Sequence, residues 1–231
     1  MTEISIDSRD GTGSFAAYVA EPDGTPRAAI VVIQEIFGVN PGIRSKCDRL
    51  AADGYLAMAP DLFWRLEPDV RLDPDVADQM QRGLALMGQF DQDKAIEDIE
   101  AAIRTARDRV DGGKVGVVGY CLGGRLAYMA AARTDCDASV GYYAVGIDGL
   151  LGEKHAIANP LMLHIAGDDG FVDKATQQRM HDGLDDQHKV TLHDYPGEDH
   201  GFATETGERR SPEAADLADQ RTAAFFARHL D

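Results

Sequence analysis

Apolar and polar residues alternate along this chain in two patterns. Short apolar runs, several rich in β-branched residues, are typical of strands buried on both faces. We expect strands at residues 28–34, 55–58, 115–119, 140–143, 160–166 and 189–195. Apolar residues spaced three and four apart predict helices at residues 41–54, 76–87, 92–110, 123–132, 174–184 and 213–230.

The order of these elements indicates the fold class. Strands that alternate with helices form βαβ units, and such units build a parallel sheet. Asn40 followed by Pro41 is a good cap and first position for the first helix. Residues 62–75 look irregular, and no linker or repeat interrupts the pattern. We therefore predict one α/β domain over residues 1–231.

One turn carries a motif. The residues GYCLGG at 119–124 directly follow the apolar run VGVV at 115–118. Glycines flank the apex of such a strand-to-helix turn because side chains there would clash with the first turn of the helix. The pattern is the G-x-S-x-G nucleophile elbow with Cys121 in place of serine. It predicts a nucleophilic thiol, with a buried structural cysteine as the alternative.

Two further polar residues follow predicted strands in an informative order. Asp169 lies in a Gly-Asp-Asp-Gly loop and His200 stands before a glycine near the end of the chain. The order nucleophile, acid, histidine is that of α/β-hydrolase triads. A thiol reacts as thiolate, so it needs a base, and a carboxylate fixes the tautomer of that base. Asp168 competes with Asp169 for this position, and His200 alone could be an ordinary loop histidine.

The charge of the chain excludes some classes of binding partner. The formal net charge is −17, from 40 acidic and 23 basic residues. Such an acidic surface repels nucleic acid and anionic lipid, so we expect neither as a partner. We also expect a monomer rather than a large oligomer.

The cysteines and the N-terminal residues indicate the cellular compartment, and residue spacing bears on metal binding. Cys47, Cys121 and Cys136 show no close pairing, which suits a reducing compartment. Residues 1–7 lack the basic and apolar regions of a signal peptide, and no apolar run is long enough to cross a bilayer. We expect a cytoplasmic protein. No metal-ligand spacing appears, so we expect no metal.

At this point the chain resembles a known family. The matching segments are QEIFG at 34–38, APDLF at 59–63, GVVGYCLGG at 116–124, GYYAVG at 141–146, DGFV at 169–172 and HGFA at 200–203. They resemble the dienelactone hydrolases, also called carboxymethylenebutenolidases, and cover almost the whole chain. The resemblance implies an α/β-hydrolase fold with a mostly parallel central sheet, helices on both faces and no large cap domain. It implies hydrolysis of a small lactone or ester through a covalent thioester, without a cofactor.

The resemblance also implies roles. Cys121 is the nucleophile, His200 the base and Asp169 its orienting acid. Glu35 contacts the thiol in the resting enzyme, and substrate displaces it. A carboxylate beside a thiol disfavours the thiolate and so protects it from oxidation. Without the resemblance, Glu35 could equally be a strand-end carboxylate paired with an arginine such as Arg44 or Arg125.

The oxyanion hole of this fold uses two backbone N–H groups, one after the nucleophile and one in an early loop. These positions are Leu122 and Ile36. Substitution of either side chain would leave its N–H in place.

The chain departs from the family where substrate binds. Two arginines that hold the substrate carboxylate in the family correspond here to Met80 and Thr204. Arg82 is close in sequence but on a different helical face, and a solvated arginine is its ordinary reading. The departure predicts a less anionic ester or lactone. Candidates for the pocket wall, with core packing as their alternative, are Phe37, Trp64, Met80, Met87, Tyr142, Phe171 and Thr204.

Two other functions compete with hydrolysis. The fold could bind a small molecule without efficient turnover, but the complete Cys, Asp and His set argues against this. A peptidase of this fold usually carries a large cap or propeller, for which 231 residues leave no room.

Overall fold

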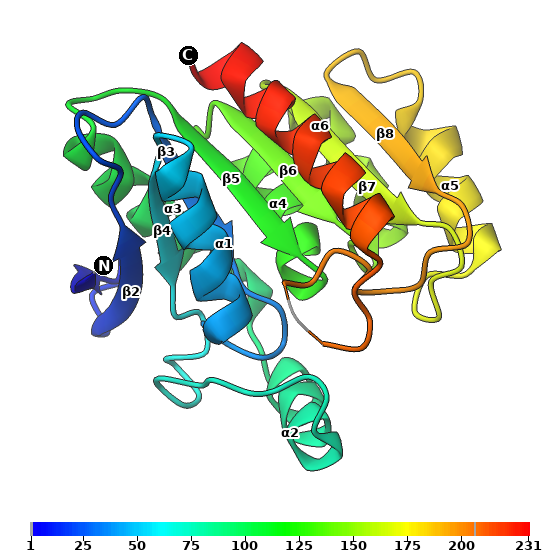
Figure 1. Ribbon diagram of the computed structural model, residues 1–231, viewed down its shortest axis with the longest axis horizontal. Coiled ribbons are helices and arrows are strands. Elements are labelled where there is room, and N and C mark those ends of the chain that lie inside the picture. The colour runs from blue at the N-terminus through cyan, green and yellow to red at the C-terminus, as the bar shows by residue number, and fades with distance from the viewer. Residues whose placement is uncertain (1, 206) are drawn as a thin grey trace. The chain divides into compact units, whose positions relative to one another are not determined.

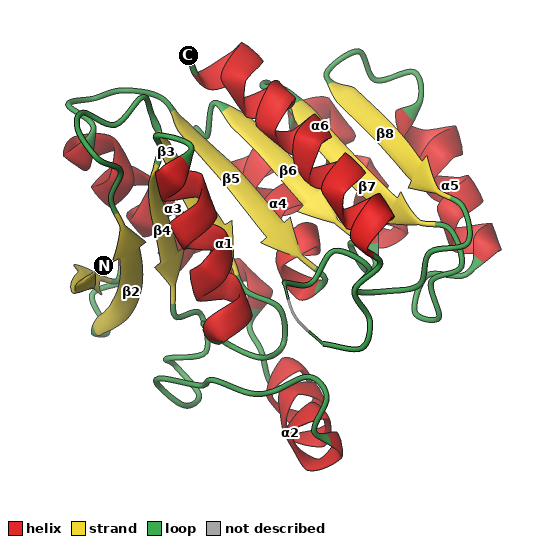
Figure 2. Cartoon of the chain, in the orientation of Figure 1, coloured by secondary structure: helices red, strands yellow, loops and turns green. Residues whose placement is uncertain are grey.

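The structure, a computed structural model, describes residues 2–205 and 207–231. The chain divides into two compact units, Met1–Gly116 and Val117–Asp231. Figure 1 labels the helices and strands, and Figure 2 separates them by type. The prediction of one domain over the whole chain stays a prediction.

The first unit holds four strands. Strands β1 (Thr2–Asp7) and β2 (Ser14–Ala20) form an antiparallel hairpin, and β2 pairs antiparallel with β4 (Leu56–Pro60). Strand β3 (Ala29–Ile33) runs parallel to β4 and is buried along its whole length. The hairpin was not expected from the sequence, because most residues of β1 face solvent and give no apolar run.

Three helices belong to the same unit. Helix α1 (Pro41–Ala52) begins as predicted, with the Asn40 side chain accepting a hydrogen bond from the Ile43 N–H. Helix α2 spans Ala77–Met87. Helix α3 (Gln92–Arg109) is capped by Asp91, which accepts from two N–H groups of the first turn. These bounds confirm the helices expected here to within two residues at each end.

The second unit repeats the βα pattern. Strands β6 (Ala138–Tyr142), β7 (Leu161–Ala166) and β8 (Val190–Tyr195) are parallel. Helix α6 (Pro212–Leu230) crosses one face of β6 and β7, and α4 (Leu122–Arg133) lies behind them (Figure 1). Helix α5 (Lys174–Leu184) packs on β8. The 3₁₀ segment η1 (Ile147–Ala156) was not expected, since it lacks a helical apolar period.

The strand order agrees with the expected fold. Strand β5 (Val115–Tyr120) begins at the end of the first unit and continues into the second. The order is β1-β2-β4-β3-β5-β6-β7-β8, in a mostly parallel eight-stranded sheet. No segment between the described elements is longer than residues 61–76, and a segment of that length is too short for a cap domain. The predicted α/β-hydrolase architecture is confirmed.

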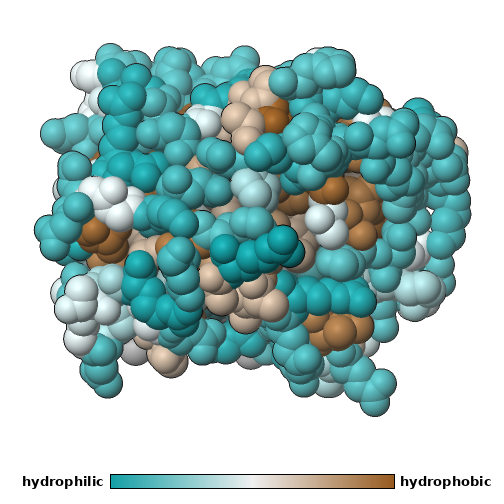
Figure 3. All heavy atoms as spheres, turned by 90° about the horizontal axis from the view of Figure 1, so that it is seen from above, coloured by the Kyte–Doolittle hydropathy of each residue, from teal (hydrophilic) through white to brown (hydrophobic). Residues whose placement is uncertain are grey.

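The exterior reflects the composition. The face shown in Figure 3 is mainly hydrophilic, with hydrophobic residues scattered among charged and polar ones. No helix among the described residues is long and apolar enough to cross a membrane.

Candidate active site

Cys121 stands at the apex of a strained turn between β5 and α4. Its φ is +55°, a left-handed conformation that a residue with a side chain rarely adopts. Its N–H donates to the carbonyl of Tyr142 at 3.0 Å, which ties the apex to the end of β6. A Cβ on Gly119 would lie 1.9 Å from the carbonyl oxygen of Gly123, and one on Gly124 would lie 2.6 Å from that of Tyr142. The glycines of the motif are therefore required by the turn, as the sequence predicts.

The acid follows β7. The Asp169 side chain is buried, and its Oδ1 accepts from the Phe171 N–H at 2.7 Å. Its Oδ2 lies 2.8 Å from Nδ1 of His200, so the protonated Nδ1 donates to the carboxylate. This leaves Nε2 as the ring atom available for proton transfer.

The side chains of the two neighbouring aspartates point to different partners. The Asp168 side chain is 61% exposed and pairs with Nζ of Lys174 at 3.0 Å. It points to solvent, whereas Asp169 points to His200.

A third carboxylate joins the two loops that carry Asp169 and His200. Oδ1 of Asp199 accepts from the His200 N–H at 2.6 Å and from the Gly170 N–H at 3.0 Å. These two backbone hydrogen bonds, the one from His200 first, lower the pKa of Asp199, because they stabilise its charged form. The acid and the histidine are therefore held in register by one side chain.

The surroundings of His200 favour its protonated form. Burial of the ring works to lower its pKa, but the negative charge of Cys121 and hydrogen bonds with Asp169 and Cys121 outweigh this effect. Together they raise the pKa of His200 to about 10. A protonated histidine that hydrogen-bonds a thiol is the kind of partner that a nucleophilic cysteine needs.

Two aromatic rings contact His200. The Tyr143 ring lies edge-on at 5.0 Å and is buried. The Phe171 ring lies edge-on at 4.8 Å and is 60% exposed. A large exposed apolar side chain against a buried histidine is a candidate wall for an organic substrate, as expected for Phe171.

The first unit holds the other residues of the predicted machinery. Glu35 is buried just after β3, and Ile36 and Phe37 follow it, both buried. A Cβ on Gly83 of α2 would lie 2.8 Å from the Ile36 carbonyl oxygen, so α2 packs closely on this loop. The proposed thiol contact of Glu35 and the proposed oxyanion hole of Ile36 and Leu122 stay predictions.

Two arginine alternatives can be placed. Arg44 donates to the Glu3 carboxylate at 2.6 Å and to the Val39 carbonyl at 3.2 Å, so its partner is not Glu35. Arg82 is 51% exposed and pairs with Glu67. It is the solvated arginine that its helical position indicated.

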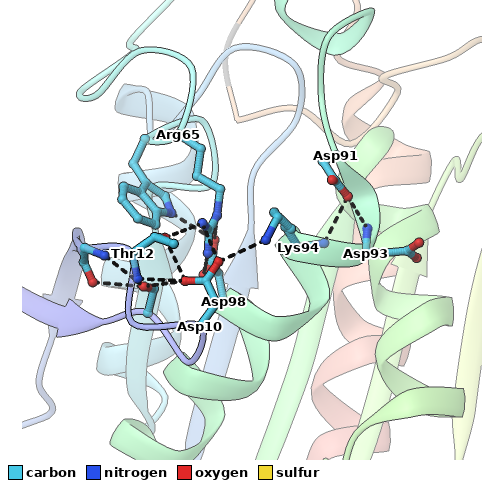
Figure 4. Close-up of polar contacts among 10 residues, drawn as sticks. Asp10, Thr12, Arg65, Asp91, Asp93, Lys94 and Asp98 are labelled. Carbon is cyan, nitrogen blue, oxygen red and sulfur yellow. Dashed lines mark hydrogen bonds and ion pairs between the residues drawn. The ribbon is translucent and has the colours of Figure 1, made fainter.

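Two expected wall residues pack internally instead. The Trp64 indole N–H donates to Asp98 at 2.8 Å and its ring stacks on Phe15 at 5.8 Å. Asp98 is completely buried and also binds Arg65, at the centre of the polar cluster in Figure 4. Tyr142 is completely buried, and its hydroxyl contacts Thr222 at 2.7 Å and Asp219 at 3.0 Å, both on α6. Both side chains therefore make internal packing contacts, and their place in a pocket wall stays a prediction.

The remaining candidates for the pocket wall differ in how deeply they are buried. Met80 and Met87 are half-buried on α2. Thr204 is buried in the loop after His200, with its N–H donating to Gly201 at 3.0 Å. No described residue hydrogen-bonds the Thr204 hydroxyl. The Thr204 hydroxyl is therefore a buried polar group without a hydrogen-bond partner among the described residues.

Sequence reasoning missed one residue near His200. A Cβ on Gly201 would lie 3.2 Å from Cδ of Arg209, so the stem of this exposed arginine runs along the residue after His200. Its charge also helps to lower the pKa of Asp199, although less than the backbone hydrogen bonds do. The neighbouring Arg210 instead binds the Thr204 carbonyl at 2.7 Å and Asp216 at 3.2 Å. The adjacent pair Arg209-Arg210 gave no indication of which side chain lies beside the histidine.

Among the described residues, no group of three or more His, Cys, Asp or Glu side chains could hold a metal ion. None of the three cysteines, which all lie in the described part of the chain, forms a disulfide bond. Burial raises the pKa of Cys47, which makes that thiol unreactive.

Comparison with known proteins adds the family. The dienelactone hydrolase family model matches residues 15–230. A protein of Azospirillum brasilense assigned as a carboxymethylenebutenolidase is 49% identical over 232 residues, covering 100% of both chains. The carboxymethylenebutenolidase of Pseudomonas putida is 39% identical over 229 residues, which are 98% of this chain and 97% of that protein. A solved structure from Klebsiella pneumoniae, assigned as a dienelactone hydrolase, has a TM-score of 0.83 and 27% identity over 99% of this chain and 100% of its own.

Proposed function

Because the chain belongs to the dienelactone hydrolase family and is a lactone or ester hydrolase, we propose that it acts through a covalent thioester on Cys121. The observation that carries this proposal is the buried His200–Asp169 pair, whose histidine interacts with the thiol on the strained turn. A protein that only binds its ligand has no need of a buried acid that orients a histidine toward a thiol.

The chemistry follows from these positions. The Cys121 thiolate attacks the carbonyl carbon of the substrate and forms a C–S bond, and the carbonyl oxygen becomes an oxyanion. The N–H groups of Leu122 and Ile36 stabilise that oxyanion. When the C–O bond breaks, Nε2 of His200 gives its proton to the leaving alkoxide.

The second half returns the enzyme to its resting state. Nε2 of His200 takes a proton from water, and the resulting hydroxide attacks the thioester. The C–S bond breaks, the acid product leaves and the thiolate is restored. From a lactone both pieces stay joined, so the product is one ring-opened acid. Between turnovers Glu35 contacts the sulfur and favours return of the proton from Nε2 of His200 to it; when substrate displaces Glu35, that proton moves back to Nε2 and the thiolate forms.

Rapid quenching tests the covalent step. We expect 4-nitrophenyl acetate to add one acetyl group to the peptide that contains Cys121 when the reaction is stopped in acid within one turnover. Mass spectrometry of the digested protein locates the adduct. An acetyl group on any other peptide, or a burst of product with no adduct, would contradict the thioester mechanism.

The position of Arg209 favours a negatively charged substrate. The sequence predicted a less anionic substrate, because Met80 and Thr204 replace two arginines. Arg209, however, lies along Gly201 next to the catalytic histidine, and the Thr204 hydroxyl is buried without a partner among the described residues. We infer that Arg209 supplies the cation for a substrate carboxylate, which reverses the expectation from sequence.

The variant Arg209→Gln tests this assignment. We expect kcat/KM for dienelactone, an anionic lactone, to fall by about 10- to 100-fold, the value of a lost charge-assisted hydrogen bond. The same variant should leave hydrolysis of neutral 4-nitrophenyl acetate within about twofold of the parent. Arg179→Gln, which removes a cation from α5, serves as the charge-matched control. Equal loss on both substrates would assign Arg209 to the fold instead.

A further inference from the structure

A groove far from the catalytic histidine lies between α6 and strands β7 and β8. Its volume is ≈ 580 Å³, which is within the range of small-molecule sites. The residues of β7 and β8 that line it either precede these strands or are among the first four residues of each strand. Asp169 and His200 instead follow the carboxyl ends of the same strands. A six-residue strand is about 20 Å long, so the two sites lie at opposite ends of these strands.

The groove is lined with basic side chains. Three carry a permanent charge, namely Lys189, Arg221 and Arg228, and three are histidines, His188, His193 and His229. None of the described residues that line it is acidic. This is notable in a chain of net charge −17, whose 40 acidic residues outnumber 23 basic ones. Chance placement of surface charge in such a chain favours acidic neighbours.

The pattern within α6 and β8 explains how the cations converge. Arg221, Phe225 and Arg228 are four and three residues apart, so they share one face of the helix. Along β8, His193 faces the groove, and the next residue, Asp194, contacts His181 at 3.1 Å. Successive strand residues point to opposite faces, so the acid of β8 is kept out of the groove.

Stabilisation of the C-terminal end of α6 explains only some of the basic residues in the groove. Cations in the last turn of a helix interact favourably with its dipole, which explains Arg228 and His229. Arg221 lies more than two turns before the end of α6, and Lys189 precedes β8. Arg221 is also oriented, because its guanidinium lies 5.3 Å from the centre of the Tyr195 ring. The helix dipole therefore does not explain the positions of these two cations.

The walls between the cations are apolar. Phe225 and Met162 are both buried, with 8% and 6% of their surface exposed. We propose that this groove binds a small organic anion that carries at least two carboxylate or phosphate groups on an apolar body. The cations would hold its acidic groups and Phe225 would pack against its body. The site is separate from the catalytic residues and does not depend on the proposed mechanism.

Fluorescence anisotropy with pyranine, an aromatic trisulfonate, tests this site on the whole protein. We expect saturable binding that Arg221→Gln/Arg228→Gln weakens by at least about tenfold. The control Arg133→Gln/Arg179→Gln removes the same charge from α4 and α5 and should stay within about twofold. Competition by citrate and by pyrophosphate, measured separately, distinguishes carboxylate from phosphate ligands. Cys121→Ala should bind pyranine like the parent.

Three results would overturn the proposal. They are no saturable binding by the parent, equal weakening in both double variants, and loss of pyranine binding in Cys121→Ala. Thermal unfolding shows whether the groove variant is folded. If Arg221→Gln destabilises the protein, the single variant Arg228→Gln replaces it, since Arg228 is exposed and carries the same expectation at lower magnitude.

Discussion

Replacing Cys121 by alanine is expected to abolish hydrolysis of both 4-nitrophenyl acetate and dienelactone. Removal of the nucleophile from a catalytic triad costs at least about 10⁴-fold in kcat, because no other group forms the covalent intermediate. The fold should survive, since alanine keeps the Cβ that the turn already accommodates. Initial rates over a range of enzyme concentrations, with circular dichroism on the same samples, check both statements.

Cys47→Ala is the matched control for that experiment. Cys47 is a free, buried cysteine on α1, and burial raises the pKa of its thiol. We expect this variant to retain turnover within about threefold, at some loss of stability from the small cavity. Full activity in Cys121→Ala, or equal loss in both variants, would remove Cys121 from the mechanism.

The second large effect is expected at Asp169. In Asp169→Asn, the single amide oxygen cannot accept from both Nδ1 of His200 and the Phe171 N–H. If it keeps the bond from Phe171, the N–H₂ group faces Nδ1 and disfavours the required tautomer. We expect kcat to fall by about 10³-fold or more. Asp168→Asn, one residue earlier, should change kcat by less than about twofold, because Asp168 pairs with Lys174 in solvent. Equal effects at the two positions would contradict the assigned acid.

The pH profile gives a second readout of the same variant. The pKa of His200 is raised to about 10, so its imidazolium persists through neutral pH and is lost as the pH rises through that value. Asp169 is one of the groups that raise it. The alkaline limb of kcat/KM in Asp169→Asn should therefore move to lower pH, measured on the residual activity. A variant that only loosened the fold would lose activity without this shift.

Much of the fold could be predicted because its signals are local. Apolar runs in the sequence indicated the buried strands, and apolar residues three and four positions apart indicated the helices. Helix α1 begins at the Asn-Pro cap that the sequence showed. The turn at Cys121 was also readable, because steric contact dictates its glycines. Chain order also pointed to Asp169 and His200, whose side chains are in contact.

Other features depend on contacts between distant residues. Trp64 looked like a pocket residue, but its partner is Asp98 on α3, which no local pattern connects to it. The choice between Asp168 and Asp169 needs side-chain directions in a loop, and both carry the same chemistry. Arg209 lies beside Gly201 only because the intervening loop folds back.

The position of the triad along the chain has a consequence for biosynthesis. All three residues, together with Asp199, lie in the unit Val117–Asp231, and the cysteine comes first. A ribosome therefore makes the proposed nucleophile well before its proposed acid and base. Until β7 and β8 pair and Asp199 joins their loops, neither His200 nor Asp169 is in place to assist Cys121. In the proposed mechanism, the nascent chain thus completes its catalytic set only after the last strand has been synthesised, which limits side reactions before folding is complete.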